Sequence, residues 1–155
     1  MTKGRLQGEI KQTRPFRSGA EEAYLNLVRT TDVLTREIAG FLKPYGLSEA
    51  QYNVLRILRG AGDEGHTCSE VGQRLITRDP DVTRLLDRLE RRDLIARSRD
   101  NRDRRVVTIR ITRAGLDLLD ELDGPMAAAT DGLLAHMAPG QLEALVALLE
   151  AARRA

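Results

Sequence analysis

Apolar residues recur at helical spacing in several segments of the chain, and they predict a mainly helical protein. The first stripe predicts a long helix that begins at a capping box formed by Ser18 and Glu21 and stops at Pro44 and Gly46. The apolar positions of this stripe are Ala23, Leu27, Leu34, Ile38, Phe41 and Leu42.

A second and a third helix are predicted after this stop. Ser48 opens the second helix, which ends at Gly60, and residues 60–65 form a loop. Thr67 and Glu70 form another capping box at the start of a short helix, whose apolar residues are Val71, Leu75 and Ile76.

A fourth helix and a hairpin follow the short helix directly. Thr77-Arg78 turns the chain, and Asp79 is expected to cap a helix that has Pro80 at its first position. The segments Ile95–Arg99 and Val106–Ile111 are predicted strands, the second with Val107, Ile109 and Ile111 facing inward. A short helix, a tight turn, a second helix and a hairpin, in that order, predict a winged helix-turn-helix.

Two more helices are predicted at the C-terminal end. Thr112 caps a long one, which Gly124-Pro125 should kink or interrupt, and Pro139 opens the last one. The long helix carries its apolar residues at Leu116, Leu119, Leu122 and Met126.

The predicted fold class is therefore mainly α (α+β), with a two-stranded β wing and a helical dimerisation region. Residues 46–112 form the DNA-binding lobe of a single domain that spans residues 18–155. The amphipathic segments 18–45 and 113–155 need a partner face, which a homodimer supplies. Residues 1–17 are expected to form a flexible basic arm.

Charge is distributed unevenly along the chain, although the net charge is only +2. Residues 97–105 hold five Arg and two Asp, and residues 1–17 hold five Lys or Arg and one Glu. A positive footprint confined to these parts is typical of a protein that binds phosphate groups of nucleic acid. The 3% aromatic content gives little support to a stacking platform for single strands.

Composition also excludes several kinds of site. The single cysteine, Cys68, cannot form an internal disulfide or a cysteine zinc cluster, and it is read as a structural residue. No pattern predicts a cofactor or metal site. No run approaches the roughly 18 apolar residues of a membrane span. We therefore expect a cytoplasmic protein that has no membrane partner.

The fourth helix presents one apolar and one polar face. Val82, Leu85, Leu86 and Leu89 are expected to face the core, and the opposite face presents Pro80, Thr83, Arg84, Asp87, Arg88 and Arg91. Thr83 and Arg84 are the predicted contacts to base edges. Thr77, Arg78 and Arg88 are the predicted contacts to phosphate.

An ordinary solvated helix is the alternative interpretation of this face. Four acidic residues nearly balance the five arginines between residues 78 and 92. Asp81 is open to three readings. It could favour the helix dipole, accept a hydrogen bond from cytosine, or restrain its neighbours Arg78 and Arg84.

The predicted wing tip is rich in arginine. Arg102 is the predicted minor-groove contact, and Asp100 is expected to orient a nearby arginine. Arg104 and Arg105 are expected to lie against phosphate. This basic hairpin next to the fourth helix favours DNA binding over the solvated-helix alternative.

These segments resemble the MarR (multiple antibiotic resistance regulator) family of bacterial winged-helix regulators over residues 20–152. The segments that carry the resemblance are Leu47-Ser48 with Gln51-Tyr52-Asn53-Val54-Leu55, Val82 to Glu90, the wing from Asp100 to Val106, and Ile111-Thr112-Arg113-Ala114-Gly115.

The resemblance implies a homodimer that binds pseudo-palindromic promoter DNA, typically as a repressor, with Asp100 and Arg102 as the functional pair of the wing. It also implies that a small anionic or phenolic effector could release the DNA from a cleft between the dimer helices and the winged lobe. The candidate ligand residues are Tyr24, Arg36, Tyr52 and His66. The chain lacks the cysteine near the first helix that oxidant-sensing members use.

Two other function classes compete with DNA binding. An enzyme is disfavoured because His66 and His136, the only histidines, stand near no ligand set, and the chain has no phosphate loop or nucleophile elbow. A winged-helix module for protein–protein contact is the second alternative. Steep salt dependence of binding to duplex DNA would separate it from a DNA-binding protein.

Overall fold

The computed structural model describes residues 5–99, 103 and 105–153 of the 155-residue chain. The chain divides into two compact units, residues 1–37 and residues 38–155, and each is described by itself. The boundary falls near the end of the long helix α2 (Gly19–Leu42).

The N-terminal unit contains a helix that the sequence analysis did not expect. Helix α1 (Arg5–Glu9) lies within the predicted flexible arm. The side chain of Gln7 donates hydrogen bonds to the carbonyls of Gln12 and Arg14, at 3.3 and 3.2 Å, and so holds the chain in a turn after the helix. The flexible basic arm over residues 1–17 stays a prediction, although residues 5–9 of it form a helix. A five-residue helix is too short to produce a periodic apolar pattern.

Helix α2 begins as predicted. The backbone N–H of Glu21 donates to the hydroxyl of Ser18 at 3.1 Å, so Ser18 is the cap. The Glu21 carboxylate, however, accepts from the backbone N–H and the guanidinium of Arg17 and does not close the box on Ser18.

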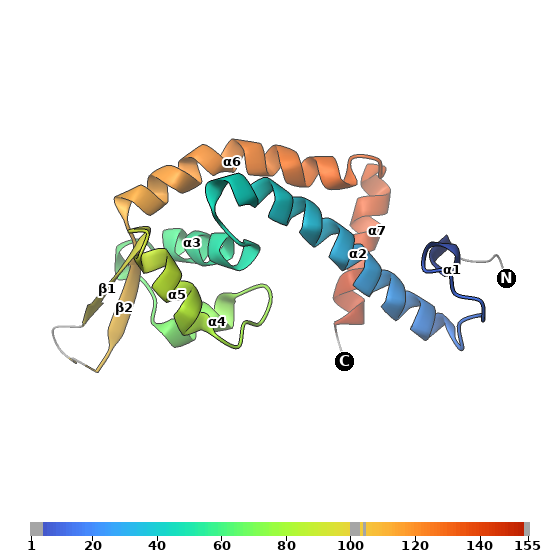
Figure 1. Ribbon diagram of the computed structural model, residues 1–155, viewed down its shortest axis with the longest axis horizontal. Helices are drawn as coiled ribbons and strands as arrows, with labels where there is room; N and C mark the ends of the chain where they lie inside the picture. Colours follow the sequence, from blue (N-terminus) through green and yellow to red (C-terminus); the bar gives the residue numbers. More distant parts are fainter. Residues whose placement is uncertain (1–4, 100–102, 104, 154–155) are drawn as a thin grey trace. The chain divides into compact units, whose positions relative to one another are not determined.

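The C-terminal unit is a winged helix with two further helices (Figure 1). It continues from the end of α2 through the 3-10 turns η1 (Lys43–Tyr45) and η2 (Gly62–Glu64), with helix α3 between them. Strands β1 and β2 pair antiparallel. These observations confirm the mainly helical winged helix-turn-helix with a two-stranded wing. The elements are α3 (Glu49–Ala61), α4 (Cys68–Arg74), α5 (Val82–Glu90), β1 (Ile95–Arg99), β2 (Val107–Ile111), α6 (Arg113–Leu134) and α7 (Pro139–Ala152).

Side-chain caps set the starts of three of these helices, as the sequence predicts. Ser48 and Gln51 form a reciprocal capping box at α3, and Thr67 and Glu70 form one at α4. The Thr112 hydroxyl accepts from the backbone N–H of Gly115 at 3.1 Å at the start of α6.

The hydrophobic core lies where α3, α5, the hairpin and α6 meet. Leu86 and Leu89 of α5 have no exposed surface, and Leu85 is 8% exposed. They belong to one cluster whose other members include Val54, Leu55, Leu58, Val71, Ile95, Ile109, Leu119 and Leu122. The predicted inward face of α5 is confirmed.

Several details of the sequence prediction are wrong. Helix α4 ends at Arg74, and Ile76, expected on its apolar face, is 88% exposed. Val107 shares the inner face of the hairpin with Ile109, as predicted, but it is 37% exposed and not buried. Of the two outcomes expected at Gly124-Pro125, an interruption does not occur: helix α6 runs through Pro125, with Leu122 and Met126 buried on either side. Figure 1 shows α6 curving along its length.

Gly65 lets a third segment join the wing. Its φ is +67°, and a Cβ atom there would lie 2.4 Å from the carbonyl oxygen of Ile109, so a side chain does not fit. His66 exchanges two backbone hydrogen bonds with Ile109, at 3.0 and 2.8 Å. The loop before α4 is therefore tied to β2.

No single helix within residues 5–99 and 105–153 is long and apolar enough to cross a membrane. The pair α6 and α7, bent by 92° at the break between them, meets the length and composition criteria only when taken together.

We predict that Leu86→Ala lowers the free energy of unfolding by about 2–5 kcal/mol, because it removes a fully buried side chain. Ile76→Ala is the matched control and should change it by no more than about 0.5 kcal/mol. Urea denaturation of both variants measures the difference. Equal losses would contradict the assignment of Leu86 to the core.

Candidate nucleic-acid interface

The turn between α4 and α5 is held in place by helix α3. The side-chain oxygen of Asn53 accepts a hydrogen bond from the backbone N–H of Ile76 at 3.0 Å. Asn53 is half-buried on α3. It fixes the turn that positions α5. No sequence pattern separated Asn53 from the residues around it.

Asp81, and not Asp79, caps helix α5. The Asp81 carboxylate accepts from the backbone N–H of Arg84 at 3.0 Å. The Asp79 carboxylate accepts from the backbone N–H of Asp81 at 2.7 Å and so closes the turn before the helix. Both aspartates fit a capping pattern in the sequence, but Pro80 lies in the turn and not at the first helical position. Of the three readings of Asp81, this geometry agrees with the first, a carboxylate at the N-terminus of the helix, and within the described residues Asp81 bonds to neither the Arg78 nor the Arg84 guanidinium.

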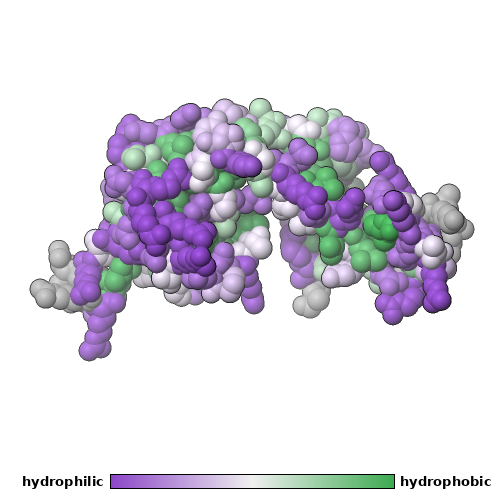
Figure 2. Space-filling model, in the orientation of Figure 1, coloured by the Kyte–Doolittle hydropathy of each residue, from purple (hydrophilic) through white to green (hydrophobic). Residues whose placement is uncertain are grey.

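The predicted recognition residues share the exposed side of the helix-turn-helix. Thr83, Arg84 and Arg88 of α5 are exposed, opposite the buried leucines. Thr77 and Arg78 are exposed in the preceding turn. The surface over α4 and α5 is mostly hydrophilic (Figure 2).

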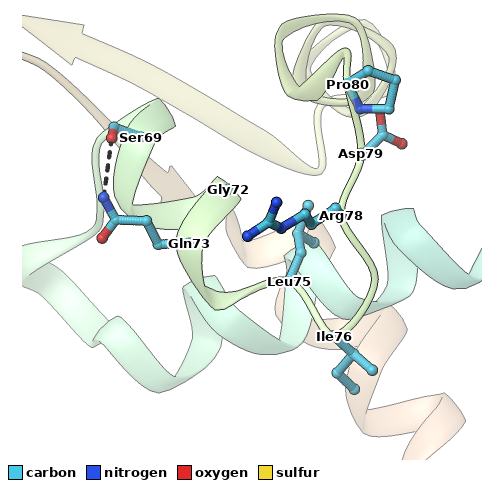
Figure 3. A pocket seen from close by; sticks show the side chains of 8 residues that line it. All are labelled: Ser69, Gly72, Gln73, Leu75, Ile76, Arg78, Asp79 and Pro80. Atoms are coloured by element: carbon cyan, nitrogen blue, oxygen red, sulfur yellow. Dashed lines mark hydrogen bonds between the residues drawn. The ribbon is translucent and has the colours of Figure 1, made fainter. Parts of the chain in front are cut away.

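A groove between α4 and the turn adds polar groups to this side of the lobe (Figure 3). Arg78 extends its guanidinium toward α4. The amide of Gln73 donates to the Ser69 hydroxyl at 3.4 Å. The groove is lined by Ser69, Gly72, Gln73, Leu75, Ile76, Arg78, Asp79 and Pro80.

The acidic residues of this region are engaged within the lobe. Arg97 of β1 donates to Asp87 at 2.7 Å and to Glu90, and both acceptors lie on α5. Asp79 and Asp81 accept from backbone N–H groups. The solvated-helix alternative expected these carboxylates to pair with arginines of the same helix, and they do not.

Four guanidinium groups are left unpaired by this arrangement. Within the described residues, the side chains of Arg78, Arg84, Arg88 and Arg91 make no hydrogen bond or ion pair. Their donors are therefore free to bind phosphate or base acceptors.

Arg97 belongs to the fold and not to the exposed basic surface. Its side chain is 24% exposed and faces α5. Burial by itself lowers the pKa of Arg97, but the hydrogen bonds to Asp87 and Glu90 outweigh that effect and raise the pKa above its ordinary value. Of the five arginines in residues 97–105, Arg97 therefore forms its ion pairs within the fold. Only the tertiary contact reveals this.

A second arginine also acts internally. The two terminal nitrogens of Arg92 donate to the carbonyls of Gly46 and Tyr45, at 2.6 and 3.0 Å. This contact ties the end of α5 to the segment before α3. Sequence reasoning did not distinguish Arg92 from its arginine neighbours.

The wing is described only in part. Arg105 is exposed, and its backbone N–H donates to the Asp103 carboxylate at 2.9 Å. Asp100, Arg102 and Arg104, which the sequence analysis assigned to the wing tip, lie outside the described residues. Their roles remain predictions.

The four candidate ligand residues come from both units. Tyr24 is 64% exposed, and Arg36 pairs with Asp32 on the surface of α2. Tyr52 is half-buried on α3, with the Arg56 guanidinium 5.9 Å from its ring centre. His66 is half-buried beside β2, with Nδ1 3.7 Å from a Glu70 oxygen.

A winged helix-turn-helix whose second helix presents free guanidinium groups defines the class of DNA-binding transcription regulators. The comparisons with known proteins agree. The model of the MarR family matches residues 47–107. The chain is 26% identical over 106 residues to the HTH-type transcriptional regulator MhqR of Bacillus subtilis (strain 168). The aligned residues cover 68% of this chain and 72% of MhqR.

Solved structures extend the similarity over most of the chain. A MarR transcription factor from Planctomyces limnophilus is 40% identical, with a TM-score of 0.69, over 88% of this chain and 98% of that one. BpsR of Bordetella bronchiseptica is 26% identical, with a TM-score of 0.74, over 84% and 97% of the two chains. Its structure concerns regulation of DNA binding by 6-hydroxynicotinic acid.

The chain belongs to the MarR family, and the resemblance drawn from its motifs is confirmed. The family consists of transcription factors and not of enzymes.

We predict that Asp81→Ala lowers the free energy of unfolding by about 0.5–2 kcal/mol, because it removes the cap of α5. Asp81→Asn keeps an acceptor at the same position and should restore most of the loss. Thermal and urea denaturation of both variants provide the measurement. A smaller loss for Asp81→Ala than for Asp79→Ala would show that the cap is assigned to the wrong residue.

Proposed function

We propose that the chain represses transcription by binding a pseudo-palindromic duplex site as a homodimer. The observation that carries this proposal is the division of charge around α5. Its acidic neighbours are engaged with Arg97 or with backbone, while Arg84 and Arg88 stay free on the face opposite the core. In this proposal Thr83 and Arg84 read base edges, and Arg78 and Arg88 bind phosphate.

Exposed apolar residues on the terminal helices support the homodimer. Helix α7 has no buried residue along its whole described length, and Val146 and Leu148 are 55% and 69% exposed. On α2, Leu27 and Val28 are 40% and 50% exposed. Covering such side chains with a second copy removes apolar surface from water. It would also give the two-fold symmetry that a palindromic site requires.

A small anionic or phenolic effector is part of the proposal. The relative BpsR, whose DNA binding is regulated by 6-hydroxynicotinic acid, supports this ligand class. The candidate contacts are Tyr24, Arg36, Tyr52 and His66. Titrating 6-hydroxynicotinic acid and salicylate into the protein–DNA complex tests the idea, and release of DNA by neither compound would count against this class.

Selection of bound duplexes from a random pool tests the function as a whole. We expect two half-sites about one helical turn apart, and an affinity that falls steeply between low and moderate salt. Failure to retain any duplex at low salt would reject DNA binding. It would favour the protein–protein module instead.

We predict that Arg84→Ala weakens binding to the selected site by about 1–3 kcal/mol and relaxes the preference at particular base pairs. Arg102→Ala, at the predicted wing tip, should weaken binding to every sequence. Mobility shifts on the selected site and on single-base variants of it separate the two effects. If both variants behave like the parent protein, the assigned roles are wrong.

We predict that Leu148→Glu converts the dimer to a monomer, because it places a charge in the proposed apolar interface without touching the core. Glu150→Gln is the matched control, since this exposed residue lies on the same helix. Sedimentation velocity reports the assembly state. A Leu148→Glu protein that sediments as a stable dimer would exclude α7 from the interface.

A further inference from the structure

The cross-strand register of the wing places alternate residues on one face. Arg97 lies opposite Ile109, and Arg99 lies opposite Val107. Side chains alternate along a strand, and residues directly opposite each other share a face. This inner face changes from buried to exposed along β1. Ile95 is 1% exposed, Arg97 is 24% exposed at its side chain, and Arg99 is exposed.

The other face of the wing has its own contacts. Arg110 donates to the Ser98 hydroxyl at 2.7 Å and to the carbonyl of Asp63 at 2.5 Å. The Ser98 bond joins Arg110 to β1, and the Asp63 bond joins it to the turn η2 before α4. The Arg110 side chain is therefore held on the outer face of the wing, whereas Arg99 lies on the inner face.

Arg97 joins the inner face of the wing to α5 through two separate bonds. One terminal nitrogen donates to Asp87 at 2.7 Å, and the other donates to Glu90, three residues further along the helix. Because the guanidinium is planar and its two nitrogens have different partners, the pair of bonds restricts rotation of β1 relative to α5. Partial burial protects these bonds from solvent screening.

Arg99 lies two residues beyond this clamp, on the same face. One two-residue step along a strand is about 6.6 Å, so Arg99 extends past the acidic pair that holds Arg97. Within the described part of the chain, the Arg99 side chain has no hydrogen bond or ion pair. An unpaired guanidinium is therefore carried on the same face of the wing as Arg97, the face that bonds to α5.

We propose that Arg99 binds a backbone phosphate of the duplex that α5 contacts, and that Arg97 is the positioning residue that directs it there. This inference rests on the proposed function, to which it adds a contact from β1 that the wing tip does not supply. Asp87 and Glu90 serve the contact indirectly by holding Arg97.

Arg99→Ala tests the contact on a mixed-sequence duplex long enough for two half-sites. We expect about tenfold weaker binding on any sequence, and a salt dependence whose slope falls by about two for a dimer, one for each lost phosphate contact. Arg113→Ala is the matched control. It removes the same charge from an exposed residue that pairs with Asp117 at the start of α6. Its affinity should stay within about twofold of the parent.

A double-mutant cycle tests the positioning role of Arg97. The background variant combines Arg97→Met, Asp87→Asn and Glu90→Gln, which removes the clamp and leaves no unpaired charge in its place. In this background Arg99→Ala should weaken binding by less than about twofold, because Arg99 is no longer directed at the duplex. The change in net charge is common to both arms of the cycle and cancels.

The outcomes separate positioning from stability. If Arg97 only stabilises the fold, Arg99→Ala will cost the same about tenfold in both backgrounds, and the positioning role is rejected. Thermal melting checks that the background variant is folded. If it is not, Arg97→Lys takes its place, because lysine keeps the charge but cannot bond two carboxylates with a planar fork. In that background too, an unchanged cost of Arg99→Ala rejects the positioning role.

The same assays distinguish failure of this inference from failure of the proposed function. If the parent protein does not bind duplex DNA at low salt, the proposed function fails. If the parent binds and Arg84→Ala weakens binding, but Arg99→Ala matches Arg113→Ala, then only the contact from β1 is wrong.

Discussion

Burial of one leucine face of α5 is the constraint on which the rest of the lobe depends. Leu86 and Leu89 are fully buried in one cluster with residues of α3, α4, the hairpin and α6, so the rotation of α5 about its axis is fixed by packing. Everything on the opposite face is then exposed together. Thr83, Arg84 and Arg88 share one surface because the leucines cannot leave the core. The geometry of the candidate interface is thus a consequence of hydrophobic packing and not of the polar residues themselves.

What this surface can bind depends on which charged side chains are paired within the fold and which are left unpaired. A chain with a net charge of +2 has no general attraction for nucleic acid, and the acidic residues near α5 could have cancelled its arginines. The fold engages those acids elsewhere. Arg97 pairs with Asp87 and Glu90 from the neighbouring strand, and Asp81 accepts from backbone. The remaining guanidinium groups keep their hydrogen-bond donors free, which is what phosphate and base acceptors require.

The winged-helix lobe is the fold expected of a member of the MarR family. The terminal helices bear on how two copies of the chain would assemble. Helix α7 exposes apolar side chains and buries none. Covering these apolar side chains with a second copy would remove them from water, which is energetically favourable. A two-fold dimer would also bring two α5 helices to one duplex. The clamp between β1 and α5 would then let each lobe act on DNA as one body, with the helix and the wing strand in a fixed relation.

The sequence by itself determined the order of the elements, the capping boxes at Ser48 and Thr67, the inward leucines of α5 and the hairpin, because these depend on local spacing and on backbone hydrogen bonds to nearby side chains. Only the tertiary structure decided which aspartate caps α5, that Ile76 is exposed, that His66 pairs with β2, and that Asn53 holds the turn. It also separated Arg97 from the other arginines of the wing. These outcomes depend on contacts between residues far apart in the chain, and a guanidinium has the same local signature whether its partner is a carboxylate across the fold or a phosphate outside it.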